Sequence, residues 1–237
     1  MTAADLASQA VLAAGLPRLA PGVPLLAEEA AAPPWAERRR WRRLWILDPL
    51  DGTRELLAGR ETFTINLALV VAGRLRLGLI HHPPSRTTWA AWRAETGWRG
   101  WIARRGRIEP LRPRLHQGAY RVVVSAARGL RDLAHLPRAL AGCPLRVARL
   151  GSALKFAHLA EGRADFYPRR APCRVWDVAA GMALVAAAGG GIRARDGRLP
   201  RLHGPSLDCP PFSAWGARLA FRLGDQNRSS RAPAVSS

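Results

Sequence analysis

The chain has 237 residues, 48% of them hydrophobic, which is enough to bury a core in one large or two small domains and excludes a disordered chain or a collagen-like fibre. It carries 37 basic and 17 acidic residues, a formal net charge of +20, but every basic residue except Lys155 is an arginine, and the arginines are scattered along the chain. We interpret them as a coding preference rather than as the clustered basic patch of a nucleic-acid-binding protein.

The first half is predicted to form one long helix followed by short strands. Thr2 and Asp5 have the spacing of a capping box, so a helix is expected over 2–15, before a turn at Pro17. A buried strand over 44–47 is expected to stop at Asp48-Pro49, because proline cannot donate to a sheet ladder. The other expected elements are a strand over 24–27, a polar loop over 30–43, a helix start at 54–57, a hairpin of 62–71 with 75–82, and a hairpin of 88–92 with 98–103.

The second half mixes strands and helices. Segment 104–120 is basic, contains two prolines and is expected to be a linker. The other expected elements are strands over 121–125, 145–149 and 164–167, and helices over 130–140, 153–161 and 178–188. This mixture predicts an α/β (α+β) layered sandwich with an N-terminal half over 1–118, a C-terminal half over 119–222 and a disordered tail over 223–237.

The cysteines and the apolar runs bear on the cellular compartment. Cys143, Cys173 and Cys209 are far apart and lack metal-ligand spacing, so neither a disulfide framework nor a zinc site is expected. The longest apolar run, 178–192, has 15 residues, fewer than the ~20 that span a bilayer. We therefore expect a soluble cytoplasmic protein; whether its basic surface contacts the inner membrane peripherally stays open.

The scarce acidic residues mark candidate sites. Asp48 ends a predicted strand, Asp51 follows after Pro49, and Gly52 allows a bend before a helix that begins at Thr53. Two carboxylates at this spacing can share a hard cation, and because no His or Cys lies nearby, oxygen ligands favour Mg²⁺ over Zn²⁺. The N–H groups at the helix start can hold a phosphate. The plainer alternative is that Asp48-Pro49 only forms a turn.

Two further acidic positions also have ordinary structural explanations. Asp177 follows Trp176 at the start of the predicted helix over 178–188, where aspartate is a common N-cap. Glu28-Glu29 follow the strand over 24–27, where a solvated loop is the usual interpretation. Neither position identifies a site on its own.

Four segments, in this order along the chain, resemble the inositol monophosphatase superfamily. Leu47-Asp-Pro-Leu-Asp-Gly-Thr53 resembles its metal-binding signature, and Trp176-Asp-Val-Ala-Ala-Gly181 followed by Ala188-Gly-Gly190 resembles its second signature. Ala27-Glu28-Glu29 and Thr2-Ala-Ala-Asp5 resemble its two other acidic elements. The resemblance runs from Thr2 to about residue 216 and implies a layered sugar-phosphatase fold with the active site between two halves.

Finer details resemble the CysQ branch of this superfamily, the 3'(2'),5'-bisphosphate nucleotidases. Asp51-Gly-Thr-Arg-Glu55 is similar to the Asp-Gly-Thr-Lys-Glu of that branch, and so are the segments 61–69, 151–156 and 166–169. Lys155 falls on a lysine of the branch. In a chain that otherwise uses arginine, its retention indicates that arginine does not substitute there; chance survival is the alternative.

The resemblance implies Mg²⁺-dependent hydrolysis of a phosphate monoester with two or three ions, inhibited by Li⁺. It implies metal ligation by the side chains of Glu28, Asp48, Asp51 and Asp177 and by the backbone carbonyl of Leu50. It also implies that Thr53 with Asp5 orients and deprotonates the attacking water, that Glu28 takes part in catalysis, and that the N–H groups of Gly52 and Thr53 contact the phosphate.

The implied substrate is 3'-phosphoadenosine 5'-phosphate, a by-product of sulfur assimilation, cleaved to AMP and phosphate; no specific nucleic acid is implied. The positions that match the nucleotide side are Ser125, Gly151, Ser152, Lys155 and Arg169. A cation there can pair the 5'-phosphate. Three alternatives stay open: an inositol-1-phosphate or sugar-phosphate monoesterase, a truncated inactive homologue, and a basic nucleic-acid-binding or regulatory protein on a degenerate phosphatase scaffold.

The chain departs from the branch at two places near the nucleotide side and at its start. Ser125-Ala-Ala-Arg128 stands where Ser-Arg-Ser-His is common, and Ala153 stands where serine is frequent, which bears on the substrate more than on the reaction type. Family members carry further helices before Thr2. We expect that Met1 corresponds to an internal position, that the start was assigned too late, and that the native chain is longer.

Overall fold

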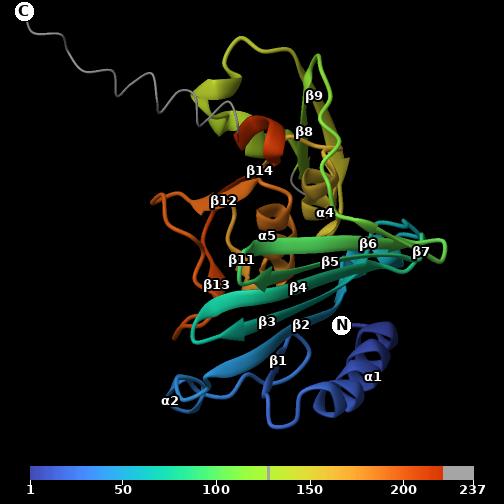
Figure 1. The fold of residues 1–237 in the computed structure, drawn as a ribbon, viewed down its shortest axis with the longest axis vertical. Coiled ribbons are helices and arrows are strands. Elements are labelled where there is room, and N and C mark those ends of the chain that lie inside the picture. The colour runs from blue at the N-terminus through green and yellow to red at the C-terminus, as the bar shows by residue number, and fades with distance from the viewer. Residues whose placement is uncertain (127–128, 221–237) are drawn as a thin grey trace, which may run out of the picture.

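The computed structural model describes residues 1–126 and 129–220, so the tail expected over 223–237 lies outside the described residues. Within them, two large sheets carry helices between and beside them (Figure 1). This arrangement confirms the layered α/β architecture expected from the sequence. The division into halves at residue 118 stays a prediction.

The first sheet has its seven strands in chain order, with β1 parallel to β2 and every later pair antiparallel. Both predicted hairpins are confirmed. Ala72 and Gly73 join β3 to β4 with φ of 49° and 71°, which is the conformation of a two-residue hairpin turn. The strands are β1 (Leu25–Ala27), β2 (Arg43–Asp51), β3 (Thr64–Val71), β4 (Arg74–His82), β5 (Thr87–Ala94), β6 (Gly97–Arg104) and β7 (Arg107–Pro110).

Four expectations for the first half are wrong. The polar loop expected over 30–43 contains the short helix α2 (Trp35–Arg38). Helix α1 (Ala3–Leu19) continues through Pro17, because buried Leu16 anchors its last turn and accepts a hydrogen bond from the Ala20 N–H at 3.0 Å. Strand β2 does not stop at Asp48 but runs to Asp51, because an irregularity in its pairing accommodates Pro49. The expected linker over 104–120 contains β7, which pairs with β6 although all four of its residues are exposed. An exposed strand has no alternating apolar pattern to predict it from.

The second sheet has the order β12-β14-β10-β8-β9. Strands β8, β9 and β10 are parallel to one another, whereas β14 runs antiparallel to β10 and β12. The strands after residue 188 were not predicted. The strands are β8 (Tyr120–Ser125), β9 (Leu145–Leu150), β10 (Phe166–Arg169), β12 (Gly191–Ala194) and β14 (Phe212–Trp215), and a separate pair joins β11 (Cys173–Arg174) to β13 (Asp208–Cys209).

The predicted helices α4 (Leu154–Glu161) and α5 (Ala179–Ala187) are confirmed. The helix expected over 130–140 is wrong: the backbone forms two 3₁₀ helices, η1 (Gly129–His135) and η2 (Arg138–Leu140). Pro137 between them cannot donate the hydrogen bond that a continuous helix needs. The remaining short helices are α2 (Trp35–Arg38), α3 (Thr53–Leu57) and η3 (Val175–Asp177).

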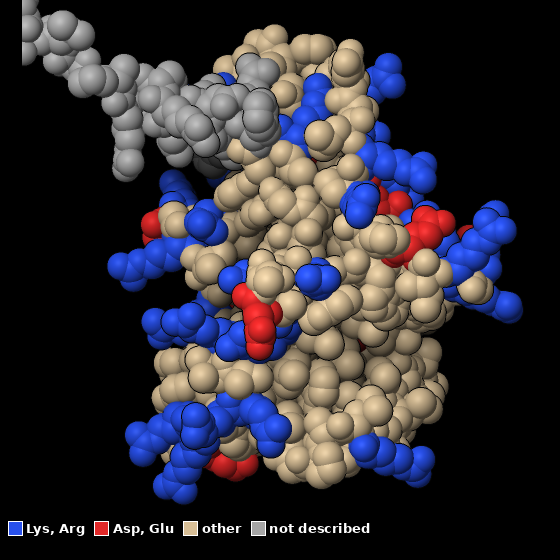
Figure 2. Space-filling model, viewed as in Figure 1, with Lys and Arg blue, Asp and Glu red and all other residues tan. Residues whose placement is uncertain are grey.

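Helix α5 packs on one face of the first sheet and against α4, so a single core cluster contains residues of both sheets and both helices. On the opposite face α1 packs against β2, and the side chains of Leu67, Leu69, Leu77 and Leu79 are only partly buried. None of the helices in residues 1–126 and 129–220 has the length and hydrophobicity needed to cross a bilayer. In the view of Figure 2, basic side chains occur in several groups separated by uncharged surface.

Candidate metal centre

The bulge in β2 places two carboxylates on the same face of the sheet. Asp48 pairs with Asn66 and Asp51 pairs with Thr64, so β2 has one residue more than β3 between these pairs. In a regular strand, residues three apart point to opposite faces. The extra residue cancels this alternation, and both aspartates lie on the face that α5 covers.

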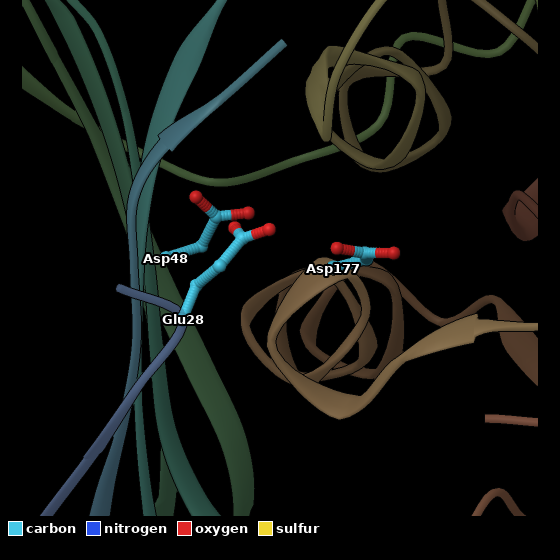
Figure 3. Close-up of side chains that lie close together, drawn as sticks. All are labelled: Glu28, Asp48 and Asp177. Atoms are coloured by element: carbon cyan, nitrogen blue, oxygen red, sulfur yellow. The ribbon is translucent and has the colours of Figure 1, made fainter. Parts of the chain in front are cut away.

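Three carboxylates from separate segments converge in front of this bulge. Glu28 follows β1, Asp48 belongs to β2 and Asp177 ends η3, and one oxygen of each lies within 4.8 Å of the others. Figure 3 shows Glu28 and Asp48 projecting from the sheet side toward Asp177 at the end of the helical segment. The cluster therefore lies between the first sheet and the segment before α5.

Electrostatics make this cluster unfavourable without a cation. Burial, with the charges of Asp51 and Glu28, raises the pKa of Asp48 well above its usual range. Although the Glu28 side chain is exposed at the mouth of the site, the surrounding protein and the charge of Asp177 raise its pKa to about 7. Burial and Asp177 raise the pKa of Asp51 to about 6. A divalent cation would restore the ionised form of all three.

Asp48 also has an oxygen without a partner. Its Oδ1 accepts a hydrogen bond from the Leu50 N–H at 3.1 Å, whereas its Oδ2 is buried and has no hydrogen-bond partner among the described residues. A buried carboxylate oxygen without a donor is unfavourable unless a cation or water completes it. All side chains of the cluster offer oxygen, so the donor set fits a hard divalent cation.

Thr53 and Asp5 form the pair that the sequence predicts. The Thr53 hydroxyl lies 3.1 Å from Asp5 Oδ1 and 3.3 Å from the carbonyl oxygen of Leu50. Burial raises the pKa of Asp5, but hydrogen bonds from Thr2 and Thr53 outweigh it and hold the value below its usual range. The ionised carboxylate also completes the predicted capping box of α1, so one side chain serves both the helix and the site.

Glycines let the chain turn tightly around the centre. Gly52, immediately before α3, has φ of 98°, which favours glycine. A Cβ on Gly151 would lie 2.7 Å from Glu55 Cγ and 2.8 Å from the Thr62 carbonyl oxygen. The turn between β9 and α4 therefore approaches α3 at a distance that only glycine allows.

Two cationic side chains border the carboxylates. Lys155 is 3% exposed, and burial lowers its pKa to about 8, an effect that the charge of Asp51 partly offsets. Its ammonium group donates to the carbonyl oxygens of Leu150 and Ser152. Arg169, at the end of β10, places a guanidinium nitrogen 3.7 Å from Asp177 Oδ2. Both predicted cations therefore lie beside the cluster.

The remaining predicted residues lie where strands β8 and β9 of the second sheet end. Ser125 ends β8 opposite Leu150 and is therefore beside Gly151. Ser152 has a φ of 47°, and its hydroxyl accepts a hydrogen bond from the Leu154 N–H at 3.3 Å. Ser152 thus supports the start of α4. Residues 127–128, in the segment that departs from the branch pattern, are outside the described residues.

One residue of the centre was not predicted. Asn66 is 1% exposed and its amide donates to Asp51 Oδ2 at 3.2 Å, which orients that carboxylate. The available signal was a polar residue at an inward position of the alternating strand over 62–71. Buried polar groups at such positions usually have a specific partner.

Comparisons with known proteins agree with this geometry. The model of the inositol monophosphatase family matches residues 1–219. Two curated relatives named 3'(2'),5'-bisphosphate nucleotidase CysQ, from Shigella flexneri and from Escherichia coli (strain K12), are each 37% identical over 203 residues, which is 84% of this chain and 77% of theirs. A solved structure of CysQ from Bacteroides thetaiotaomicron superimposes with a TM-score of 0.76 at 29% identity, covering 90% of this chain and 83% of that one.

Proposed function

Because the chain belongs to the inositol monophosphatase family, we propose that it removes the 3'-phosphate of 3'-phosphoadenosine 5'-phosphate and yields AMP and inorganic phosphate. It is a phosphoric monoester hydrolase, and the relatives named CysQ support a nucleotide as its substrate. The observation that carries the proposal is the convergence of Glu28, Asp48 and Asp177 from three separate segments. A phosphate dianion repels hydroxide, so a centre that gathers cations is what its hydrolysis needs.

We propose that the family's metal is Mg²⁺ in this chain, with two or three ions. When bound, Mg²⁺ lowers the pKa of a coordinated water and stabilises the leaving oxygen. The side chains of Glu28, Asp48, Asp51 and Asp177 and the Leu50 carbonyl would hold it. The partnerless Asp48 Oδ2 and the raised pKa values of Glu28 and Asp51 support this ligand set.

Thr53 and Asp5 would prepare the attacking water. The Thr53 hydroxyl can accept a hydrogen bond from the water while it donates to Asp5 Oδ1, and so fixes where the water lies. The lowered pKa of Asp5 keeps that carboxylate ionised and able to receive a proton through Thr53. Glu28, whose carboxylate a bound cation would keep ionised, would be the other acceptor of a proton during the reaction.

The two ends of the substrate would meet different groups. The N–H groups of Gly52 and Thr53 would contact the scissile phosphate. Lys155 and Arg169 would balance the second phosphate, which the metal ions do not hold. The residues completing the nucleotide side would be Ser125, Gly151 and Ser152. We place this reaction in the cytoplasm, where a small phosphorylated nucleotide is available.

The decisive experiment measures phosphate release from 3'-phosphoadenosine 5'-phosphate and from inositol 1-phosphate, with Mg²⁺, with and without Li⁺. We expect the nucleotide to be preferred and Li⁺ to inhibit. Preference for the inositol ester would contradict the substrate but leave the reaction type in place. Absence of metal-dependent phosphate release from either ester would support the inactive-homologue alternative.

A further inference from the structure

A cavity opens in the second sheet where β10 and β12 end and β14 begins. The last residues of β10 and β12, Arg169 and Ala194, both pair with Phe212 at the start of β14. The cavity beside them has a volume of about 470 Å³. Its polar lining consists of Asp132, Arg169, Arg170, Arg193, Arg195 and Ser213.

Four arginines around one cavity produce a local excess of positive charge. Arg170, Arg193 and Arg195 are exposed, and none of them forms an ion pair with an acidic side chain in the described part of the chain. Figure 2 shows basic side chains gathered at the edge of the molecule where Figure 1 places β12. Guanidinium groups match the oxygens of phosphate and sulfate better than any other side chain. The lining therefore suits a tetrahedral oxyanion.

One buried carboxylate, that of Asp132, favours an anion that still carries a proton. Asp132 is 2% exposed, and its Oδ1 accepts a hydrogen bond from the Arg170 N–H at 3.2 Å. Its Oδ2 has no hydrogen-bond partner among the described side chains and is covered by protein, so a ligand reaches this oxygen only when the Asp132 side chain turns toward the cavity that it lines. A carboxylate facing a fully ionised anion repels it, whereas an anion that still carries a proton can donate to the free oxygen.

We propose that this cavity binds inorganic phosphate as hydrogen phosphate, whose O–H donates to Asp132 Oδ2. Its ionised oxygens then face the guanidinium groups of Arg170, Arg193 and Arg195. Sulfate has the same shape and charge but carries no proton at neutral pH, so the same cavity disfavours it. A phosphate monoester is largely deprotonated at that pH as well, so Asp132 selects the free ion over a nucleotide.

The cavity lies next to the carboxylate cluster, which indicates how a phosphate site there would serve the reaction. Arg169 lines the cavity and also pairs with Asp177 of the carboxylate cluster at 3.7 Å. Free phosphate is a product of the proposed function, so a second phosphate site next to the centre would receive it as it leaves. Binding in the cavity itself requires no metal and no hydrolysis, and it is tested without either.

Isothermal titration of the full chain in a chelator measures this binding directly. We expect phosphate to bind at least about tenfold more tightly than sulfate or AMP, because the latter two leave Asp132 facing an anion without a donor. The double variant Arg193→Gln/Arg195→Gln should bind phosphate about tenfold or more weakly. Asp132→Asn should abolish the preference over sulfate, because an amide can donate to either ion. Arg198→Gln, an exposed arginine outside the cavity lining, should behave as the unaltered chain.

Three outcomes would overturn the proposal: equal affinity for sulfate, binding that the double variant leaves unchanged, or no saturable binding of phosphate. Equal binding of AMP would assign the cavity to a nucleotide-borne phosphate instead and contradict the free ion. Because both arginines are exposed, the double variant tests the site even if Asp132→Asn fails to fold. If the unaltered chain binds phosphate but hydrolyses neither ester, the result would contradict the proposed function and leave the phosphate site in place.

Discussion

The three clustered carboxylates and Asp51 are held in surroundings that favour a cation over four negative charges. Burial and mutual repulsion raise the pKa values of Glu28, Asp48 and Asp51. Asn66 and Lys155 partly oppose this for Asp51, and Arg169 pairs with Asp177. Lys155 and Arg169 together do not neutralise the four carboxylates. A bound cation would supply the missing positive charge, so metal affinity and the stability of the folded chain are linked.

Replacing Asp51 with asparagine tests the assignment of this residue as a ligand. The substitution removes a charge without changing the shape of the side chain, and we expect phosphate release at saturating Mg²⁺ to fall by at least about 100-fold. Asp196→Asn, in an exposed turn, is the matched control and should retain full activity. Near-normal turnover in Asp51→Asn would contradict the metal assignment.

The raised pKa values predict how stability depends on pH when metal is removed. A carboxyl whose pKa is higher in the folded chain than in the unfolded chain binds more protons when folded, so stability falls as pH rises. For Asp51, whose pKa rises from 3.8 to about 6, we expect a loss on the order of 3 kcal/mol over the whole titration, about half of it between pH 5 and pH 8. Glu28 extends the window to about pH 7.

Urea unfolding at pH 5 and pH 8, in chelator and in Mg²⁺, measures this loss. Saturating Mg²⁺ should remove most of it, because the cation then keeps the carboxylates ionised. The variant Asp51→Asn should show a smaller loss in chelator than the unaltered chain. An equal loss with and without Mg²⁺ would show that groups outside the centre cause it.

Contact between α5 and β4 positions the elements around the centre. A Cβ on Gly78 of β4 would lie 2.5 Å from the Ala180 carbonyl oxygen and 2.7 Å from Ala183 Cβ. We expect Gly78→Ala to destabilise the chain by about 1–3 kcal/mol, because α5 has to move away from the sheet. Gly15→Ala in α1, where the added methyl meets nothing within 4 Å, should stabilise it by about 0.5–1 kcal/mol. Equal urea midpoints for the two variants would contradict this close packing.

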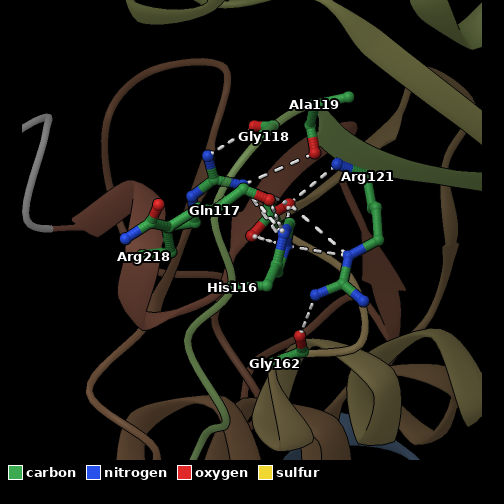
Figure 4. Close-up of polar contacts among 8 residues, drawn as sticks. His116, Gln117, Gly118, Ala119, Arg121, Gly162 and Arg218 are labelled. Atoms are coloured by element: carbon green, nitrogen blue, oxygen red, sulfur yellow. Dashed lines mark hydrogen bonds and ion pairs between the residues drawn. The ribbon is translucent and has the colours of Figure 1, made fainter.

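A network of polar contacts ties the segment before β8 to the second sheet and to Arg218 (Figure 4). Asp165, 1% exposed, accepts a hydrogen bond from the Arg121 N–H at 2.7 Å and lies 3.0 Å from His116 Nε2. Arg218 adds an ion pair at 3.6 Å and donates to the Gly118 carbonyl oxygen at 2.7 Å. The network joins three stretches of chain, residues 116–121, residues 162–165 and Arg218, and adds side-chain contacts to the pairing of β8 with β10.

Asp165→Asn should lower the unfolding free energy by about 3 kcal/mol, because the basic side chains then lose a buried charged partner. The residue lies outside the metal centre, so activity per folded molecule should be unchanged. Urea unfolding together with phosphate release checks both parts, with Asp196→Asn as the exposed control. A loss of turnover without a loss of stability would give Asp165 a role in the reaction instead.

At the scale of the whole molecule, one core includes residues of both sheets together with α4 and α5. The chain should therefore unfold in a single transition, with its metal centre between the layers. Mg²⁺ at about 100 times its dissociation constant would add about 2.7 kcal/mol, which raises Tm by roughly 5–10 °C. Calorimetry with and without Mg²⁺ measures this shift. Two separate transitions, of which only one responds to Mg²⁺, would contradict a shared core.

Much of the fold could be predicted because apolar alternation and turn residues are local signals. The hairpins of β3 with β4 and of β5 with β6, and the helices α4 and α5, follow from such patterns. The exposed strand β7, the continuation of α1 through Pro17 and the 3₁₀ form of η1 depend on tertiary contacts and backbone detail that no local pattern contains.

For the site, the acidic motifs predicted Glu28, Asp48 and Asp177, which the structure brings together. Asn66 was not identified as part of the centre, because its polar inward position does not show which group it meets; the pairing of β2 with β3 sets it beside Asp51. The catalytic and nucleotide-binding roles of the other residues stay predictions. The cavity of arginines with Asp132 was not foreseen either, since its lining comes from four separate segments.

The additional residue in β2 makes the relative lengths of the paired segments 48–51 and 64–66 as important as their composition. Inserting one residue into β3 between Thr64 and Asn66 would leave every acidic residue in the chain, yet regular pairing of β2 with β3 would then resume. Asp51 would face the side where α1 packs, because residues three apart in a regular strand point to opposite faces. An alignment that scores only identities would rate such a homologue as intact, although it could no longer collect its ligands around a common ion.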